Sequence, residues 1–404
     1  MNKYLITLTP VDRFFFGGEI GFSRGSKIEK KENETAEEKT LRQENEKLLK
    51  VDETNSSYIV KSKLFPQQTS LLGMLRFAFL SANDKAFANG KIIDHVEATK
   101  TIGAESFSLG ADTEMNFGKI KTIYPCFLRR KTAKQDWINL TVAPMDYKLS
   151  ITFDKGNALL NNRKMKTPAI KGYDPKAGLT SYCIGENISE LETGKLFTED
   201  IRIGIDRNFD GKPNEGAFYK QIAYRMSEEY EYEQDGVTTT EEHQLCFAFH
   251  AVLEEGLDDQ IVTLGGDNSR FKLTCVLDEG CVQLPKNCQP DEFNGYAGKV
   301  VLLSDAFIDH ATMNGCLYSI NEIVTFRFLY SKVGETTGYY KFSCGNHLRR
   351  SEKKYNLYQT GSVFYFDTIM EMETFIVALE SKKRFRQIGY NYYEKFQKQN
   401  NNNN

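Results

Sequence analysis

The segment KYLITLT, residues 3–9, alternates polar and apolar side chains with a period of two, the pattern of a half-buried β-strand. Tyr4, Ile6 and Leu8 fall on one face, so we predict a strand that ends at Pro10. Further strands are predicted within 119–153 and in KVVLLSDAF, IVTFRFLY and SVFYFD, whereas FPQQTSLLGMLRFAFL and a segment near 368–380 have helical spacing. This mixture predicts an α+β protein.

Composition narrows the class further. The 404 residues carry Lys+Arg 52 and Asp+Glu 55, a net charge of −3, which excludes a uniformly basic nucleic-acid coat but permits a local basic groove. No apolar run is long enough for a membrane-spanning helix, and the opening MNKYLITLTPVDR lacks the features of a signal peptide. The eight cysteines form no Cys-x-x-Cys pair. We therefore expect a cytoplasmic protein with reduced thiols, without a metal or other cofactor and without membrane contact.

A loop rich in Cys, Pro and Asn at 281–295 is the predicted domain boundary. It divides the chain into residues 1–285 and 286–397, followed by a disordered tail at 398–404. The first domain contains a charged insertion at 26–57, in which residues 27–50 hold seven basic and seven acidic side chains. Such a segment buries little surface, so it is either a solvated helix or disordered; a mobile flap over a bound strand is the less favoured alternative.

The run FFFGG, residues 14–18, follows the first strand. Three consecutive Phe cannot all face one core, and Gly17 and Gly18 permit a tight turn with an exposed backbone. Two interpretations are equally favoured: a loop whose rings stack on a planar ligand, or a bulged strand end packed in the core.

The helical segment after Pro66 has two candidate capping residues, Thr69 and Ser70. Its apolar positions are predicted to face the core; they are Leu71, Leu72, Leu75, Ala78 and Phe79. Arg76 falls among or beside them, where a structural ion pair is the usual role and phosphate recognition the alternative.

Basic residues gather in three places. A corner at 129–131 lies between predicted strands, and Arg163, Lys164, Lys166 and Lys171 occur in a stretch punctuated by Pro and Gly that we predict to be a long loop. Near the end, residues 382–393 interleave cations with aromatic rings, the combination that single-stranded nucleic acid requires. Solvated surface and core tyrosines are the alternative.

Two segments carry acidic patterns. Asp206-x-Asn208-x-Asp210-Gly211 matches the opening of a calcium loop, but Ala217 stands where the loop needs its bidentate Glu, so we predict a hairpin turn. Residues 227–242 contain seven acids, no Lys or Arg, and the turn signal Asp235-Gly236. We expect an acidic hairpin that faces solvent or a basic protein partner.

No motif for nucleotide hydrolysis, metalloprotease or deaminase chemistry is present. Cys344-x-x-His347 is half of a metal site without a second half nearby. Metal-free RNA cleavage needs a base and an acid, and the five histidines are scattered through the sequence. From its residues alone the chain has basic and aromatic patches and no catalytic constellation.

Several segments, taken in order, resemble one family. They are ITLTPVDRFFFGG, FPQQTSLLGMLR, IRIGIDRNFDGKPNEGAFY, LGGDNSRF, GSVFYF and the terminal IGYNYY. Together they resemble the RAMP-superfamily subunit of type III-B CRISPR (Cmr) effector complexes that holds the 5′ handle of the crRNA.

This resemblance implies two ferredoxin-like (RRM-like, RAMP) domains, the second degenerate, and a non-catalytic role. The implied partners are the crRNA 5′ handle, the large cyclase/polymerase-type subunit and backbone RAMP subunits. Positions carried over as handle-binding candidates lie in three of these motifs: Arg13, Phe16, Gly17 and Gly18; Thr69, Ser70 and Arg76; and Gly389 and Tyr390.

The basic and aromatic residues add a hypothesis about roles. Arg163 and Lys164, together with Arg384 and Arg386, are expected to contact phosphates, while Phe16 and Tyr390 are expected to stack on or wedge against bases. The alternatives are a metal-independent endoribonuclease of the same superfamily, with His95 or His250 as base, and the equivalent handle subunit of another type III complex.

Overall fold

The computed structural model describes residues 1–17, 20–21, 58–110, 112–160, 163–176, 178–186, 190–207, 210–211, 213–234, 236–290, 292–334, 349–351 and 353–398. The predicted insertion at 26–57, Gly18, Cys344-x-x-His347 and tail residues 399–404 lie outside these ranges. The described part is strand-rich with few helices, which confirms the predicted α+β class.

One large antiparallel sheet is built around β1 (Asn2–Pro10), which lies between β16 (Val237–Leu253) and β18 (Arg270–Leu277). Its main path has the order β12-β11-β8-β7-β16-β1-β18-β17, with β6 and β15 paired to β16 off this path. The other strands are β6 (Ile120–Ile123), β7 (Phe127–Thr132), β8 (Ile138–Val142), β11 (Tyr182–Ile184), β12 (Leu191–Glu192), β15 (Glu229–Gln234) and β17 (Gln260–Thr263). Tyr4, Ile6 and Leu8 are buried on one face, as the alternation predicted.

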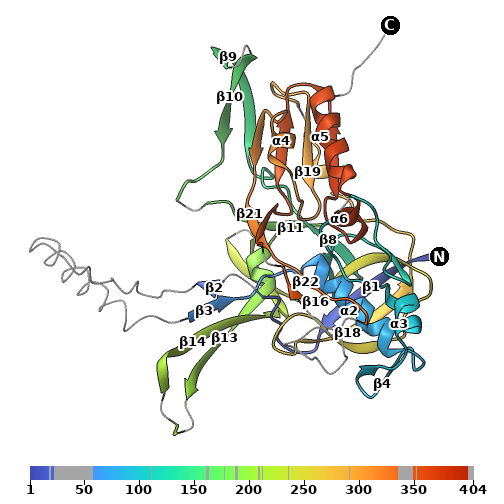
Figure 1. Ribbon diagram of the computed structural model, residues 1–404. Helices are drawn as coiled ribbons and strands as arrows, with labels where there is room; N and C mark the ends of the chain where they lie inside the picture. The colour runs from blue at the N-terminus through green and yellow to red at the C-terminus, as the bar shows by residue number, and fades with distance from the viewer. Residues whose placement is uncertain are drawn as a thin grey trace, which may run out of the picture.

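Helix α2 (Gln68–Ser81) covers that face (Figure 1), and its five predicted apolar positions are all buried. The predicted cap is wrong: the helix begins at Gln68 with Gln67 as N-cap, and no side chain caps it. Thr69 and Ser70 instead lie inside the first turn. Helix α3 (His95–Ile102) packs beside α2 and is capped by Asp94, whose carboxylate accepts from the Val96 and Glu97 amides.

A second antiparallel sheet has the order β20-β25-β19-β26. It consists of β19 (Gly298–Leu302), β20 (Tyr318–Ile320), β25 (Val363–Phe366) and β26 (Tyr393–Gln397). Helix α5 (Ile369–Ser381) packs on β19 and β25, which confirms the helix predicted near 368–380. The single turn α4 (His310–Met313) and the short α6 (Lys383–Gln387) complete this half.

Two long ribbons project from the body in different directions (Figure 1). The first pairs β9 (Ser150–Leu160) with β10 (Arg163–Lys171), so the long loop predicted there is wrong. Pro168 is tolerated because β10 pairs only with β9 and keeps a free edge. The second ribbon is β13 (Phe197–Arg207) with β14 (Pro213–Met226), extended by β3 (Tyr58–Lys61) and β2 (Ile20–Gly21).

Both predicted hairpins are present. Strands β13 and β14 flank the Asp206–Gly211 segment, which confirms a hairpin there, although residues 208–209 and 212 lie outside the described ranges. Strands β15 and β16 form the acidic hairpin, with Gln234 opposite Val237. The remaining elements are β4 (Phe87–Ala88) with β5 (Lys91–Ile92), β21 (Ile323–Phe326) with β24 (Tyr355–Tyr358), β22 (Leu329–Tyr330) with β23 (Arg349–Arg350), and the 3₁₀ turns Thr193–Leu196 and Lys286–Cys288.

Buried clusters extend across the predicted boundary at 285/286. One joins α2 residues to Phe326, Phe385 and Tyr390, and another joins residues between 143 and 184 to β19 and β25. The boundary itself stays a prediction. Among the described residues, no helix has the length and apolarity needed to span a bilayer.

Candidate nucleic-acid interface

Three segments far apart in the sequence meet at the end of β1: residues 11–17, the β17–β18 turn at 265–269, and the β13–β14 ribbon. Backbone hydrogen bonds hold them together. Phe14 and Tyr224 exchange amide–carbonyl bonds of 2.7 and 3.0 Å, and the Gly266 amide donates to the Phe15 carbonyl at 2.7 Å. The Phe15 amide also donates to Ser269 Oγ at 2.9 Å. Three of the motifs that carry the family resemblance therefore form one local structure.

The three consecutive Phe side chains alternate in and out. Phe14 is fully buried and Phe16 is 8% exposed, with its ring stacked 5.8 Å from that of Phe271. A ring packed in this way presents no face to a base, so the stacking role predicted for Phe16 is wrong for the folded chain. Phe15 points the other way, is half-buried and lines a surface pocket. Gly17 has φ +77° and open space around it, consistent with a turn.

The pocket has a volume of about 170 Å³ and lies between the loop after β1 and the β17–β18 turn. It is lined by Val11, Asp12, Arg13, Phe14, Phe15, Ala223, Asp267, Asn268, Ser269 and Arg270. Asp267 and Asn268 both have φ near +55°, which small polar residues tolerate, and this turn shapes one wall. We use the name arginine-lined pocket for this pocket together with Arg202 and Arg225, which lie beside it.

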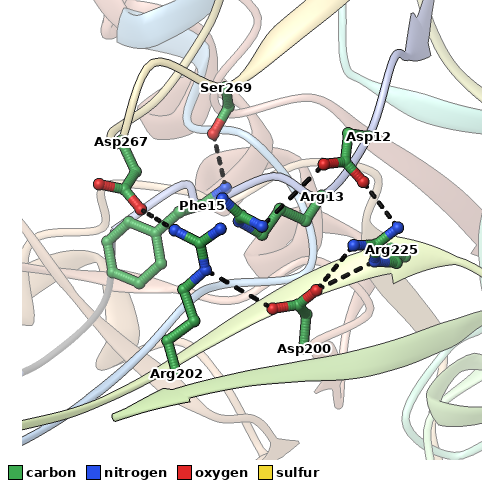
Figure 2. Close-up of polar contacts among 8 residues, drawn as sticks. All are labelled: Asp12, Arg13, Phe15, Asp200, Arg202, Arg225, Asp267 and Ser269. Carbon is green, nitrogen blue, oxygen red and sulfur yellow. Dashed lines mark hydrogen bonds and ion pairs between the residues drawn. The ribbon is translucent and has the colours of Figure 1, made fainter. Parts of the chain in front are cut away.

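Figure 2 shows Arg225 between Asp12 and Asp200, and Arg202 extending toward Asp267. Arg225 lies 2.6 Å from Asp12 and 2.9 Å from Asp200, whereas both carboxylate contacts of Arg202 measure 3.9 Å. The hydrogen bond to Asp200 raises the pKa of Arg225, so the guanidinium stays charged. Because the arginine side chains are 44% and 49% exposed, these pairs are weak in water and their guanidinium groups remain accessible to an incoming phosphate.

No motif in the sequence distinguished Phe15, Arg202 or Arg225 from their neighbours. A signal was present: Asp200 and Arg202 alternate with Ile201 and Ile203, so the polar residues of β13 share one face. That this face meets Arg13 and Phe15 depends on strand pairing and could not be read from the sequence.

A second pair of motifs meets at the start of α2, where the terminal segment 387–393 docks. With its amide oriented to satisfy both groups, Gln68 donates to the Ile388 carbonyl at 3.3 Å and accepts from the Cys126 amide at 3.0 Å. Gly389 is required there, because a Cβ would lie 2.8 Å from the end of the Gln68 side-chain amide and 2.9 Å from the Tyr124 carbonyl. Tyr390 is 1% exposed and packs on Phe326 and Phe385, so its predicted base-stacking role is wrong for the same reason as that of Phe16.

Arg76 is 5% exposed and has a structural role, but not in an ion pair. Its Nε donates to the Ile102 carbonyl at 3.0 Å and its Nη2 to that of Gly103 at 3.3 Å. These are carbonyls at the end of α3, where a cation also complements the helix dipole. Burial lowers the pKa of Arg76 to about 10, so it remains charged at neutral pH. This position is inaccessible to phosphate.

The terminal cations are already engaged in the free chain. Arg384 donates to the Thr113 and Ser108 carbonyls at 3.1 and 3.0 Å. Arg386 donates to the Asn391 carbonyl at 3.3 Å and stacks over Tyr392 at 4.9 Å. Both are half-buried, and their phosphate role stays a prediction. The same holds for Arg163 and Lys164, which stand in β10 opposite Leu160 and Leu159.

Two of the four described histidines, His243 and His250, are held by polar partners inside the protein. His250 is 2% exposed with Nε2 3.3 Å from Asp278, and His243 is held between Arg130 Nε and the Ser227 carbonyl, each at 3.0 Å. Burial lowers the pKa of both rings. Within the described ranges, no group of three His, Cys, Asp or Glu side chains could hold a metal ion.

Comparison with known proteins places this chain among CRISPR-associated proteins. The family model described as "CRISPR-associated protein (Cas_Cmr3)" matches residues 50–393. The chain therefore belongs to the Cas_Cmr3 family, and the resemblance to Cmr subunits inferred from its motifs is confirmed at this level.

Two solved structures are similar. One chain from "Cryo-EM structure of the Type III-B Cmr-beta bound to cognate target RNA" is 13% identical, with 97% of this chain and 96% of that chain covered and a TM-score of 0.44. A chain from the structure of this complex bound to target RNA and AMPPnP is also 13% identical. The match covers 97% of this chain and 95% of that chain, with a TM-score of 0.42. No curated protein matches the sequence.

Proposed function

We propose that this chain is the non-catalytic subunit of a type III-B Cmr effector complex that holds the 5′ handle of the crRNA. The observation that carries the proposal is the arginine-lined pocket, a cavity lined by Arg13, Arg270 and Phe15, with Arg202 and Arg225 paired to its lining residues Asp267 and Asp12. Guanidinium groups beside an accessible ring suit single-stranded RNA, whose phosphates and unstacked bases need both kinds of contact. The proposed partners are the large cyclase/polymerase-type subunit and the backbone RAMP subunits.

The two sheets support the RAMP assignment. We propose that each is ferredoxin-like, because the orders β18-β1-β16-β7 and β26-β19-β25-β20 both read fourth-first-third-second along the chain. Helix α2 supplies the first crossover of the first unit, and α5 the second crossover of the second. The first crossover of the second unit contains only the four-residue α4, which fits a degenerate domain.

The acidic residues of the pocket have a role in this proposal. Asp12, Asp200 and Asp267 neutralise the arginines in the free chain, and RNA phosphates would replace them. A charge-assisted hydrogen bond to phosphate oxygens has the same geometry as one to a carboxylate. The acids therefore lower the affinity for arbitrary polyanions, and only RNA that also fills the pocket beside Phe15 gains the full set of contacts.

The test measures binding of the host's own crRNA handle, as a fluorescent RNA, to the full chain at increasing salt. Arg202→Ala and Arg225→Ala are each expected to weaken binding and to lower the salt slope by roughly 0.7 for each phosphate that the variant no longer neutralises. Lys61→Ala is the matched control, because Lys61 is an exposed cation of the same sheet whose register places it on the other face. Equal effects of all three substitutions would contradict the proposal.

The ring is tested separately. Phe15→Ala is expected to weaken handle binding by about tenfold without changing the salt slope, since stacking on a base involves no counterion release. Phe77, 56% exposed on α2, supplies the control substitution Phe77→Ala. Metal-independent cleavage of repeat RNA by the full chain, abolished by His95→Ala or His250→Ala, would instead favour the endoribonuclease alternative.

A further inference from the structure

The face of the large sheet opposite α2 is a second basic and aromatic surface, separate from the arginine-lined pocket. Alternation puts Thr9, Arg129, Lys131, Asn139, Gln244 and Lys272 on it, together with Trp137 at the start of β8. We call these residues the open sheet face. Residues around Val282 cover only the neighbouring patch formed by Leu5, Phe127 and Ala248.

Three cations on this face can hold phosphates: Arg129, Lys131 and Lys272. Lys131 and Lys272 are exposed, and the only acid that pairs with them among the described residues is Asp136, 3.1 Å from Lys131 and 83% exposed. Arg129 stands opposite Cys246 and Asn139 in the register, so it lies in the middle of the sheet and not at an edge. Its Nε is buried and makes no hydrogen bond among the described residues, which leaves a charged donor without an acceptor.

Trp137 gives the face a stacking platform. It is half-buried, and the guanidinium of Arg129 lies 5.6 Å from its ring centroid. A cation held over an indole fixes the ring in place at low entropic cost, and the half-buried ring keeps some surface on which a base can stack. Asn139 follows it on β8, and Gln244 and Thr9 lie further across the sheet on β16 and β1; their amide and hydroxyl groups can form hydrogen bonds with sugar or base edges.

We propose that the open sheet face binds single-stranded RNA, with a base stacked on Trp137 and phosphates held by Arg129, Lys131 and Lys272. Alternate side chains of each strand in an antiparallel sheet project from the same face, so one RNA strand lying on that face can contact both the ring and the cations. Arg129, Lys131 and Lys272 supply the positive charge that a polyanion needs, while the acids of the same face, Glu242 and Asp278, lie further along β16 and just after β18. This surface is independent of the handle site.

Trp137 is the one tryptophan in the sequence, so intrinsic fluorescence reports on this face alone. Titration of the full chain with oligouridylate at low salt is expected to quench the emission to saturation. Lys131→Glu with Lys272→Glu should raise the half-saturating concentration about tenfold or more. Lys85→Glu with Lys100→Glu, an equal charge change at exposed lysines near α3, should not.

A second measurement guards against misfolding. Binding of labelled oligouridylate, followed by anisotropy, should fall about tenfold in Trp137→Ala and be largely retained in Trp137→Phe, which keeps a stacking ring. Absence of quenching, or equal effects of the two lysine pairs, would overturn the proposal. One result would refute this inference and leave the proposed function standing: handle RNA binds without quenching the Trp137 fluorescence, and its affinity falls only in Arg202→Ala and Arg225→Ala.

Discussion

At the scale of single residues, several buried polar side chains of this protein bond to its backbone. Arg76 is the clearest case, because its guanidinium satisfies the last carbonyls of α3 from inside the core. A buried charge in such a position stabilises only while its partners remain, and its removal leaves carbonyl groups without donors. Arg76 therefore fixes α3 against α2 rather than contacting a ligand.

We predict that Arg76→Met lowers the free energy of unfolding by roughly 2–4 kcal/mol, the cost of unsatisfied buried carbonyls. Denaturant unfolding measures it. The control is Lys100→Met, which removes an exposed cation from the last turn of α3. It should change the free energy of unfolding by less than about 0.5 kcal/mol. The folded Arg76→Met protein should bind handle RNA as tightly as the original; weaker binding at unchanged stability would restore the phosphate role.

His243 makes stability depend on pH. Its pKa is lowered from 6.5, first by burial and then by the nearby Arg130, so the folded protein favours the neutral ring that accepts from Arg130. The unfolded chain binds the proton first as pH falls. The stability from His243 is therefore complete above about pH 6.5 and is lost as pH falls from there through the folded pKa.

We predict that His243→Gln flattens the fall in unfolding free energy between neutral pH and about pH 5. Urea titrations at several pH values provide the measurement, and the exposed His310→Gln is the control. An unchanged pH profile in His243→Gln would show that the ring is not coupled to folding. His250→Gln should act in the same direction, because burial lowers that pKa as well.

At the scale of elements, the docking of the 387–393 segment on the start of α2 decides how the C-terminal half attaches. The contact is tightly packed at Gly389, where φ is +95° and an added Cβ would collide with the Gln68 side chain and the Tyr124 carbonyl. Helix α2 has no side-chain cap, and Gln68 in its first turn contacts this segment instead. Helix start and terminal motif thus stabilise each other.

Gly389→Ala is predicted to lower the unfolding free energy by about 2 kcal/mol or more, through left-handed strain and displacement of Gln68. Gly73→Ala is the opposite case: this exposed position in α2 has no atom within 4 Å of an added Cβ. It should stabilise by about 1 kcal/mol through helix propensity. Thermal unfolding of both variants gives the sign, and stabilisation by Gly389→Ala would contradict the packing.

At the scale of the whole molecule, a buried ion pair links the two sheets. Asp146, which follows β8, accepts from Lys299 Nζ of β19 at 2.8 Å and from the Tyr365 hydroxyl of β25 at 2.5 Å. Lys299 is 5% exposed and Asp146 9%. Together with apolar clusters that cross residue 285, this contact makes the two halves energetically interdependent.

We predict that Lys299→Met lowers the unfolding free energy by roughly 3–5 kcal/mol, because it leaves the Asp146 carboxylate buried without its cation. The double variant Asp146→Asn/Lys299→Met should recover part of this decrease, since no charge remains buried. Calorimetry should show one cooperative transition for the original chain. Two separate transitions would mean that the halves are independent.

The sequence by itself determined the local elements of this protein. Period-two alternation located β1, the apolar runs KVVLL and VFYF located β19 and β25, helical spacing located α2 and α5, and the turn signal at Asp235-Gly236 located the acidic hairpin. These features depend on neighbouring residues, so local patterns contain them. The stretch at 163–171 was misassigned as a loop because its Pro and the Gly residues after it outweighed a strand pairing that depends on β9.

Which residues are accessible was decided by the tertiary structure. Phe14, Phe15 and Phe16 are the same residue type, yet Phe14 and Phe16 are buried and only Phe15 of the three is half-buried, beside the pocket. Arg76 and Tyr390 are buried, whereas Arg202 and Arg225 become accessible because strand register places both on the face that meets the loop after β1. Burial and register depend on contacts between residues far apart in the chain. Local sequence patterns fix the periodicity of each segment but not which partner its outward face meets.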